Sequence, residues 1–243
     1  MTTVSEGCGL DLTLLAYPSA DHQRIKEVIA ELLANDVQSL AFHLQVGKMI
    51  PFLLGKGGRG MVFMGLREQR KVAVKVLRTD AAVKTMRFEA ENLRHANKEG
   101  IGPLLYSWSS NVIVMQYVDG QSFGRTIATS ISRETAAIID KTLEQTYILD
   151  TVHLDHGQLT NASDHVIVTP EKTPVIIDFS HSSRTRKPKN VTAFASYLIR
   201  SINLTQSKDQ NLVSALKHYK QNKSRTTFEA LKQAIAHELL KTF

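Results

Sequence analysis

The chain has 243 residues, 42% of them hydrophobic, a formal net charge of +7 and one cysteine. This length accommodates one two-lobed domain or two small ones, each with an ordinary globular core. No apolar run approaches the roughly 20 residues of a membrane span, and the N-terminus lacks the basic region of a secretory signal. The single cysteine, Cys8, excludes an internal disulfide framework. These features predict a cytoplasmic globular protein that does not associate with a membrane.

The positive charge is concentrated toward the C-terminus. Residues 184–243 contain twelve Lys/Arg and three Asp/Glu. Such a segment can attract nucleic acid or an acidic protein partner, and the alternative is a lysine-rich helical face in solvent. Because the charges form no dense run and few aromatic residues lie among them, the solvated face is favoured.

The first 46 residues are expected to form a helical extension. Asp21 is a candidate N-cap for a helix in residues 21–46. Apolar residues follow at i, i+3, i+4 spacing, namely Ile25, Val28, Ile29, Leu32 and Leu33. A second short helix is predicted from Val37 to Leu44. The extension is either a winged-helix-like appendage or a plain brace packed on a sheet, and the brace is favoured.

A glycine-rich stretch follows at residues 52–76. Gly55, Gly57 and Gly60 have G-x-G-x-x-G spacing, which two unrelated phosphate sites share. In a dinucleotide-binding unit these glycines open a helix. Here short apolar runs and a polar turn predict strand, loop, strand, turn and strand, which suits a flap over nucleotide phosphates. Lys75 then lies on the third strand, where its ammonium group can meet phosphates, whereas the alternative is a glycine-rich hairpin with a surface lysine.

The next segments predict a helix, a strand pair and a hinge. A helix is expected over Asp80–Asn97, and Glu89 lies nearer than Glu91 to its apolar face. For both acids, a solvated helix charge is the alternative. Residues 104–108 and 112–117 are predicted to pair as antiparallel strands. The run from Met115 to Gly120 then passes from apolar to polar, as expected of a hinge between lobes.

The second chemical stretch follows a predicted long helix over Arg133–Asp150. It begins with the loop HLDHGQLTN at residues 153–161. Two short apolar runs around a Pro-containing turn then predict a hairpin, with Asp178 just past its end. A carboxylate in that place can hold Mg²⁺ against phosphates, and a capping aspartate is the alternative.

Together these pieces resemble the protein kinase-like superfamily, and most closely its small RIO-like and archaeal-type predicted serine/threonine kinases. Over residues 50–200 the resemblance rests on LGKGGRGMV, VAVKV, FEAENL, MQYVDG, DHGQL, HVIV and IIDFS. It implies a two-lobed α+β fold: residues 47–118 form an antiparallel N-lobe with one key helix, and residues 119–243 form a reduced, mainly helical C-lobe. It also implies ATP bound between the lobes, Mg²⁺, and transfer of the γ-phosphoryl group to a protein hydroxyl.

The resemblance also implies roles for individual residues. Lys75 holds the phosphates, Glu89 orients Lys75, and Asp178 carries the metal, with His165 as a second candidate ligand. Backbone groups at Gln116 and Val118 would bind an adenine edge. The implied nucleotide-binding set is Gly55, Lys56, Gly57, Gly60, Val62, Ala73, Lys75, Glu89, Met115, Gln116 and Val118.

The loop DHGQL departs from the kinase pattern. Where the family has H-R-D or H-G-D, this chain has His156-Gly157-Gln158. An amide orients a hydroxyl but cannot take its proton, so Asp155 is a candidate substitute and His156 a candidate loop brace. The asparagine that supplies a second metal ligand is also missing at its usual spacing. These departures leave two alternatives to a kinase acting on Ser/Thr of protein: a nucleotide-binding pseudokinase that acts as a switch or scaffold, and a small-molecule kinase.

Two further readings concern the histidines and the C-terminus. A zinc cluster of His153, His156, His165 and His181 is disfavoured, because no cysteine accompanies them and their spacing matches no closed zinc pattern. Residues 213–219 and 227–240 are predicted to be amphipathic helices that close the C-lobe. Thr226 or Thr227 is expected to cap the second helix, with Glu229 in its first turn.

Overall fold

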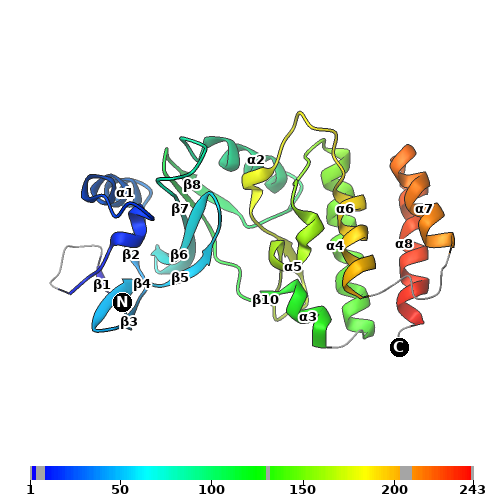
Figure 1. Cartoon of the computed structure of the whole chain (residues 1–243), viewed down its shortest axis with the longest axis horizontal. Helices are drawn as coiled ribbons and strands as arrows, with labels where there is room; N and C mark the ends of the chain where they lie inside the picture. Colours follow the sequence, from blue (N-terminus) through cyan, green and yellow to red (C-terminus); the bar gives the residue numbers. More distant parts are fainter. Residues whose placement is uncertain (1, 4–8, 130–131, 203–209, 242–243) are drawn as a thin grey trace. The chain divides into compact units, whose positions relative to one another are not determined.

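The computed structural model describes all of the chain except residues 1, 4–8, 130–131, 203–209 and 242–243 (Figure 1). Cys8 lies outside the described residues. By their contacts the residues divide into two compact units. The first unit comprises Met1–Arg94 and Pro103–Tyr117, and the second comprises His95–Gly102 and Val118–Phe243. Among the described residues, no helix is long and apolar enough to cross a membrane.

The first unit is built on an antiparallel sheet of seven strands in the order β1-β2-β6-β7-β9-β8, with β5 paired to β6. A separate hairpin pairs β3 with β4. The strands are β1 (Thr2–Thr3), β2 (Ser39–Leu40), β3 (Phe42–Gln45), β4 (Lys48–Pro51), β5 (Leu53–Lys56), β6 (Gly60–Arg67), β7 (Arg70–Leu77), β8 (Leu105–Trp108) and β9 (Val112–Gln116). The helices are η1 (Thr13–Ala16), α1 (His22–Ala34) and α2 (Arg87–Asn97), whose last three residues belong to the second unit.

The β6–β7 hairpin is the centre of this sheet and confirms the predicted strand, turn and strand. Glu68 and Gln69 both have positive φ, 49° and 62°, which gives a two-residue turn that matches the twist of the flanking strands. The pairing runs without a shift from Arg67 opposite Arg70 to Gly60 opposite Leu77. The hairpin therefore fixes where the glycines of β6 lie relative to Lys75 on β7.

Helix α1 packs on this sheet as a brace. Asp21 caps it, as predicted, by accepting hydrogen bonds from the backbone N–H groups of Gln23 and Arg24. Val28 and Leu32 are fully buried in one cluster with apolar side chains of β6, β7 and β9. The extension therefore completes the core of the first unit, in agreement with the favoured reading.

The predicted helix from Val37 to Leu44 is wrong, so the extension is not wholly helical. Helix α1 ends at Ala34, and Asp36 has a φ of 60°, the left-handed conformation that commonly terminates helices. The chain then adds β2 to the sheet, where Ser39 pairs with Leu66 of β6 and Leu40 with Gly65. Unpaired backbone groups at the edge of β6 favour this pairing over another helical turn.

Helix α2 begins at Arg87, seven residues later than predicted. Asp80, the first residue of the predicted helix, lies outside it, and its carboxylate accepts two hydrogen bonds from the Arg78 guanidinium, at 2.8 and 2.6 Å. The Thr85 hydroxyl instead accepts from the Arg87 N–H at the start of the helix. Met86 and Ala90 pack against Leu77 and Ile113 of the sheet.

The second unit is mainly helical, with a small antiparallel sheet in the order β10-β11-β12. The predicted hairpin is present, with Val166 opposite Ile176 and Val168 opposite Pro174. The strands are β10 (Gln121–Ser122), β11 (Val166–Val168) and β12 (Pro174–Ile176). The helices are α3 (Phe123–Thr129), α4 (Arg133–Thr151), η2 (Leu159–Asn161), α5 (Ala162–His165), η3 (Phe179–His181), α6 (Asn190–Ser201), α7 (Gln210–Gln221) and α8 (Arg225–Leu240).

Helices α7 and α8 lie side by side at the C-terminal end of the chain (Figure 1). Their existence confirms the sequence prediction, but the predicted cap of α8 is wrong. Ser224 is the N-cap, and Thr227 is the third helical residue of a reciprocal capping box. Glu229 consequently lies beyond the first turn.

Candidate active site

In the first unit, an ion pair joins the strand lysine to helix α2. Lys75 Nζ lies 2.6 Å from Glu89 Oε1, and the two side chains are only 4% and 10% exposed. Lys75 is on β7 between Val74 and Val76, which are buried in the core. A buried ammonium group is costly unless it is paired and hydrogen-bonded. The pair therefore fixes the position of an otherwise flexible side chain.

The neighbouring acid of α2 has a different partner. Glu91 Oε1 accepts from Arg87 Nε at 2.8 Å, one helical turn earlier, and Arg87 is 62% exposed. Only Glu89 of these two acids contacts Lys75 by an observed ion pair. The wheel argument that Glu89 lies nearer the apolar face thus matches the geometry.

Gly60 is required by the path of the Lys75 side chain. A Cβ atom at Gly60 would lie 2.9 Å from Lys75 Cε, closer than real Cβ atoms approach, and 3.1 Å from the Val76 carbonyl oxygen, which is a tight contact. The Gly57 N–H donates to the Gly60 carbonyl at 2.9 Å and closes the loop between β5 and β6. A glycine at position 60 therefore lets the loop approach the lysine directly.

The other residues predicted to bind nucleotide surround this centre in different ways. Val62 pairs with Gly55 on one side and with Lys75 on the other. Ala73 is buried and pairs with Met115 of β9. The Gln116 N–H donates to the Leu104 carbonyl at 2.8 Å, so an adenine contact at this residue would use its carbonyl oxygen, and that contact stays a prediction. Val118 belongs to the second unit, and its role stays a prediction.

In the second unit, a buried polar network holds the loop that begins at His153. Asn190, the first residue of α6, is 1% exposed. Its Oδ1 accepts from the His156 N–H at 2.8 Å, and its Nδ2 donates to the Leu154 carbonyl at 2.8 Å and to Asp150 Oδ1 at 2.8 Å. Tyr219 Oη donates to the other Asp150 oxygen at 2.9 Å. Burial raises the pKa of Asp150 above its usual range, and these hydrogen bonds oppose that shift.

His156 lies fully buried on the inner side of this loop. Its Nε2 donates to the Ile177 carbonyl at 3.0 Å, and its ring stands edge-on to Phe179 and His165. Burial lowers the pKa of His156 to about 4, so the imidazole is neutral at pH 7. The structure thus gives His156 the contacts of a brace.

Gln158 and Asp178 are the polar residues of the second unit that remain candidates for contact with substrate. Gln158 Oε1 accepts from His181 Nδ1 at 3.0 Å. Asp178 has a φ of 64° and caps η3, with one carboxylate oxygen accepting from the Ser180 N–H at 3.1 Å. The capping role raised as an alternative is therefore present, and it uses one of the two carboxylate oxygens.

Asp155 does not have the geometry of a catalytic base. Its side chain is 1% exposed. One oxygen accepts from Arg186 Nε at 2.7 Å and the other from the Lys189 N–H at 3.2 Å. Its backbone pairs with Ser183. Asp155 therefore joins the loop at 153–161 to the basic segment at 184–189, and the proposal that it substitutes for the missing aspartate is withdrawn.

The residues present fit a magnesium ion at Asp178 better than a metal cluster. Among the described residues, no group of three His, Cys, Asp or Glu is placed to hold a metal ion. Mg²⁺ needs no such group, because it is commonly bound through one or two carboxylates, substrate phosphates and water. His165 lies edge-on to the His156 ring, and imidazole suits softer metals. Ser163, counted five residues after Gln158, packs against Gly124 of α3.

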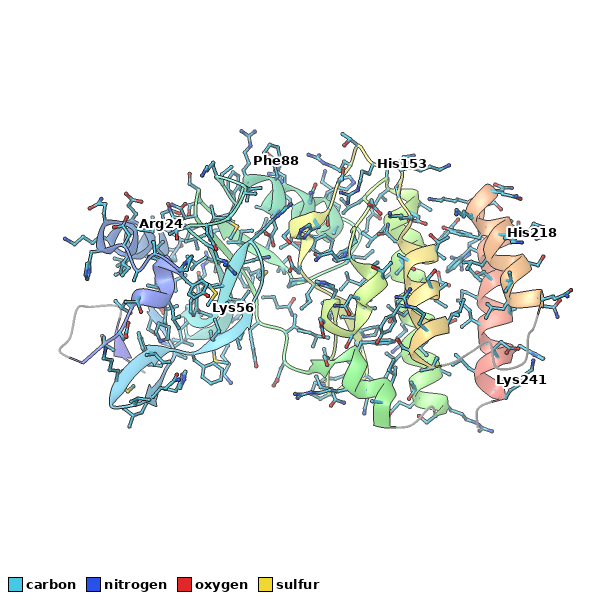
Figure 2. The ribbon with its side chains drawn as sticks, in the orientation of Figure 1. Arg24, Lys56, Phe88, His153, His218 and Lys241 are labelled. Carbon is cyan, nitrogen blue, oxygen red and sulfur yellow. The ribbon has the colours of Figure 1, made fainter. Side chains whose placement is uncertain are left out.

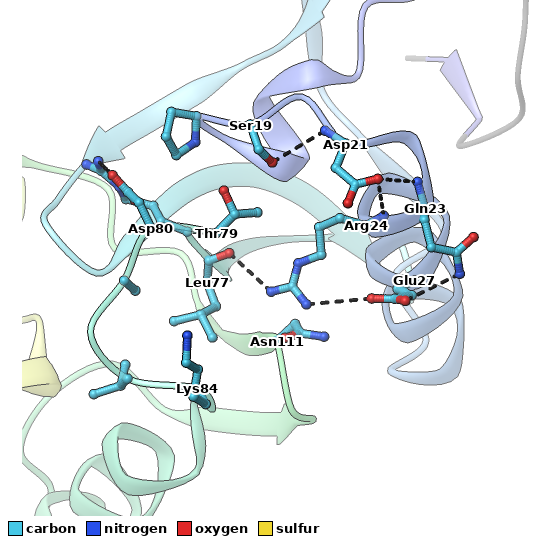
Figure 3. Close-up of a pocket in the computed structure, with 14 residues that line it drawn as sticks. Ser19, Asp21, Gln23, Arg24, Glu27, Leu77, Thr79, Asp80, Lys84 and Asn111 are labelled. Atoms are coloured by element: carbon cyan, nitrogen blue, oxygen red, sulfur yellow. Dashed lines mark hydrogen bonds and ion pairs between the residues drawn. The ribbon is translucent and has the colours of Figure 1, made fainter.

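A cavity of about 610 Å³ lies on the first unit, between the start of α1 and the segment after β7 (Figure 3). Arg24 extends into it toward Glu27 and the Leu77 carbonyl. None of the predicted nucleotide-binding residues lines it. It is therefore separate from the Lys75 centre, although Arg78 lines it and also contacts the glycine-rich loop.

An antiparallel sheet with a glycine-rich loop and a lysine paired to a helix glutamate, in a chain with a mainly helical second unit, is consistent with the protein kinase-like class. The family model described as RIO domain matches residues 66–203. The chain belongs to the RIO family, whose members are generally ATP-dependent Ser/Thr kinases. The match includes Lys75, Glu89, Gln158 and Asp178 and begins after the glycines. Comparison with curated proteins gave no match.

The sequence of α4 contains one signal for the buried network. On α4 the buried positions include Leu143, Thr146 and Leu149, and Asp150 continues this stripe. An acid on the apolar face of a helix indicates a buried polar partner, since an unpaired carboxylate there is costly. Neither Asn190 nor Tyr219 is identified as that partner by spacing.

Proposed function

We propose that this chain is an ATP-dependent phosphotransferase of the RIO type that acts on serine or threonine residues of a protein. The observation that carries the proposal is the buried ion pair of Lys75 and Glu89 beside Gly60. An ion pair with a purely structural role would not need a glycine at position 60. Here the absence of a Cβ atom at Gly60 leaves room for the Lys75 side chain. Membership of the RIO family supports the same activity.

The residues divide the work of phosphoryl transfer as follows. Lys75 binds the phosphates of ATP as a fixed positive charge, and Glu89 keeps it in place. Asp178 and water would hold Mg²⁺, which when bound neutralises charge on the phosphates. Gln158 orients the hydroxyl of the substrate through its amide group. The electrostatic and positioning terms are the main part of catalysis in this class of reaction.

No carboxylate takes the place of the missing base in this proposal. Asp155 is the only acid in residues 153–161, and it is buried against Arg186. Phosphoryl transfer has a loose transition state and needs little help from a base, so loss of the aspartate lowers the rate without abolishing it. We therefore expect a slow kinase.

A nucleotide-binding pseudokinase is the second candidate, and the same loop favours it. Gln158 accepts from His181, and this contact competes with the orientation of a substrate hydroxyl. Under this function the chain binds ATP and transfers nothing. A kinase for a small hydroxyl compound is the third candidate and differs from the first only in its acceptor.

Two measurements test these functions. Mg²⁺–ATP is expected to raise the melting temperature of the parent protein, and the Lys75→Met variant is expected to lose that shift. A parent protein that shows no shift contradicts all three functions. With γ-labelled ATP, transfer to protein by the parent but not by the Asp178→Asn variant supports the protein kinase. Equal label in both contradicts catalysis at this site, and no label in either excludes the protein kinase and leaves the other two functions.

The basic C-terminal segment gives weaker support for a nucleic-acid or acidic partner. Several of its cations form ion pairs within the second unit: Arg225 with Glu144 and Glu229, and Lys232 with Asp140 and Glu144. Arg186 is paired with Asp155. These pairs reduce the charge that is available to a partner. If nucleic acid does bind, its affinity should fall steeply with salt, and absence of binding at low salt excludes this partner.

A further inference from the structure

Tyr17, from the extension before α1, contacts Lys56, the residue just before the glycine-rich loop Gly57–Gly60. Its hydroxyl accepts from Lys56 Nζ at 2.7 Å, and the same ammonium group lies 4.0 Å from the centre of the Tyr17 ring. Figure 2 labels Lys56, the last residue of β5 and the residue just before Gly57. The ring of Tyr17 also lies 4.9 Å from the Arg78 guanidinium. One aromatic side chain thus contacts two cations, Lys56 just before the loop and Arg78 just after β7.

Arg78 carries this contact directly to the loop backbone. Its Nη1 donates to the Gly57 carbonyl at 2.9 Å, and its backbone N–H donates to the Arg59 carbonyl at 3.0 Å. Arg78 also lines the cavity beside α1, where side-chain packing is incomplete. The orientation of its guanidinium therefore depends on the paired carboxylate of Asp80 and on the ring of Tyr17.

Tyr17 is itself held in place by its backbone. Its carbonyl accepts from the Thr79 N–H at 3.0 Å and from the Thr79 hydroxyl at 3.3 Å. The residues before it form η1, in which Leu15 and Ala16 are fully buried. A ring fixed from two directions is able to restrain a neighbour, which a ring on a mobile tail could not do.

The loop needs such external contacts because its own sequence makes it flexible. Gly57, Gly58 and Gly60 lack side chains that could pack, and glycine has the largest backbone freedom of any residue. The bond from Gly57 to the Gly60 carbonyl is the hydrogen bond observed within the loop. A ligand that binds a disordered loop must order it, and prior ordering removes that cost.

We propose that Tyr17 is a positioning residue of the nucleotide site, which holds Lys56 and, through Arg78, the loop Gly57–Gly60 in the conformation that receives phosphates. The inference rests on the proposed function only for the identity of the ligand. The extension is then a functional part of the phosphate-binding unit in addition to a brace of its core. The hydrogen bond from Lys56 lowers the pKa of Tyr17, which agrees with a close contact between the ammonium and the phenol oxygen.

The test compares Tyr17→Phe and Tyr17→Ala with a matched control, Tyr106→Ala. Tyr106 is on the same sheet and has its own cation contact, with Arg67 at 5.6 Å, whereas the contacts of Tyr17 are with Lys56 and Arg78. The dissociation constant of Mg²⁺–ADP is measured by calorimetry. We expect about tenfold weaker binding for Tyr17→Ala and about threefold for Tyr17→Phe, which keeps the ring and loses one charge-assisted hydrogen bond. Tyr106→Ala should bind as the parent does.

Tyr17→Phe separates positioning from packing. It preserves the ring and its packing against the core, so a purely structural role predicts an unchanged dissociation constant for this variant, and that result overturns the proposal. In a double-mutant cycle, Tyr17→Phe should have no further effect once Lys56 is replaced by Met, and additive effects also overturn it.

A measurement without nucleotide keeps the inference distinct from the proposed function. Amide hydrogen exchange at residues 57–60 should be faster in Tyr17→Ala than in the parent and unchanged in Tyr106→Ala. If the parent binds no nucleotide, the proposed function fails, and the exchange rates alone decide whether Tyr17 restrains the loop. Equal exchange in the parent and Tyr17→Ala refutes the restraint.

Discussion

Lys75 Nζ and Glu89 Oε1 lie 2.6 Å apart, with both side chains at most one-tenth exposed. The two residues come from β7 and α2, and the packing of Met86 and Ala90 on the sheet sets the distance between these elements. Removing one partner of a buried pair leaves an uncompensated charge, so the pair affects stability as well as ligand binding.

Replacing Glu89 with Ala should therefore lower the free energy of unfolding of the first unit by about 3 kcal/mol. It should also weaken the binding of Mg²⁺–ATP, because Lys75 loses its fixed position. The matched control is Glu91→Ala, which removes a pair with a 62% exposed Arg87 on the same helix and should cost about 0.5 kcal/mol or less. Urea unfolding measures the two variants, and equal losses would contradict the central role of Glu89.

The two aspartates of the second unit should separate stability from activity. Asp155→Asn removes an ion pair with Arg186, which is 51% exposed and can return to water, so we expect a loss of about 1–3 kcal/mol in unfolding free energy. Residual phosphoryl transfer by the folded fraction should remain. Asp178→Asn should abolish transfer with little change in stability. Transfer that is lost in a fully folded Asp155→Asn protein would restore Asp155 as a base.

Buried neutral His156 should make the protein less stable in mild acid. Its pKa in the folded state is about 4, below the value of about 6.5 for an unfolded chain. Above pH 6.5 the His156 side chain is neutral in both the folded and the unfolded state, so it adds no pH dependence to the stability there. As the pH falls from 6.5 to 4 the unfolded state binds the proton first, and stability falls by up to about 3 kcal/mol.

The variant that tests this is His156→Gln, whose amide can still donate to the Ile177 carbonyl. The difference in unfolding free energy between the variant and the parent cancels the titration of other groups to a first approximation. That difference should shift in favour of the variant as the pH falls from 6.5 to 4. His153 is exposed, and His153→Asn should follow the parent. A parallel pH dependence for His156→Gln and the parent would show that His156 is charged when folded.

Local sequence patterns predicted the parts of the fold whose structure depends on residues that are close together in the sequence. The β6–β7 hairpin and the β11–β12 hairpin have alternating or apolar runs on either side of a turn, and both are present. The wheel of α2 also put Glu89, and not Glu91, toward the sheet where Lys75 lies. In these places the local pattern and the tertiary contacts agree.

The predictions that were wrong concern residues whose partners lie far along the chain. Residues 37–44 have a helical pattern, but Ser39 and Leu40 pair with β6, whose edge would otherwise lack hydrogen bonds. Asp80 was predicted to begin helix α2, but its carboxylate pairs with Arg78 and the helix begins at Arg87. Asp155 looks like a spare carboxylate until Arg186, 31 residues later, is seen to occupy it. The spacing of apolar residues indicates which helix or strand a residue belongs to. It gives no information about a distant residue that binds the same backbone or side-chain group.

The last prediction concerns the network of Asp150 and Asn190 beneath the candidate catalytic loop. Asn190 is 1% exposed, and its side chain bonds three groups, from α4 and from residues 154 and 156. Asn190→Ala should lower the unfolding free energy by about 3 kcal/mol, since two buried backbone groups and a carboxylate each lose a partner. Asn190→Asp is the sharper variant: it keeps the acceptor for the His156 N–H but sets a second carboxylate beside Asp150.

Two carboxylates at that distance cannot both ionise easily, so Asn190→Asp should be destabilised at pH 7 and should recover part of its stability as the pH is lowered and one of them binds a proton. Asn161→Ala is the control, because Asn161 is exposed and bonds only Asp164 among the described contacts of its side chain. Urea unfolding between pH 5 and 8 provides the measurement. A loss for Asn190→Asp that does not depend on pH would mean that the amide is needed for shape alone, and that Asp150 is already protonated in the folded protein.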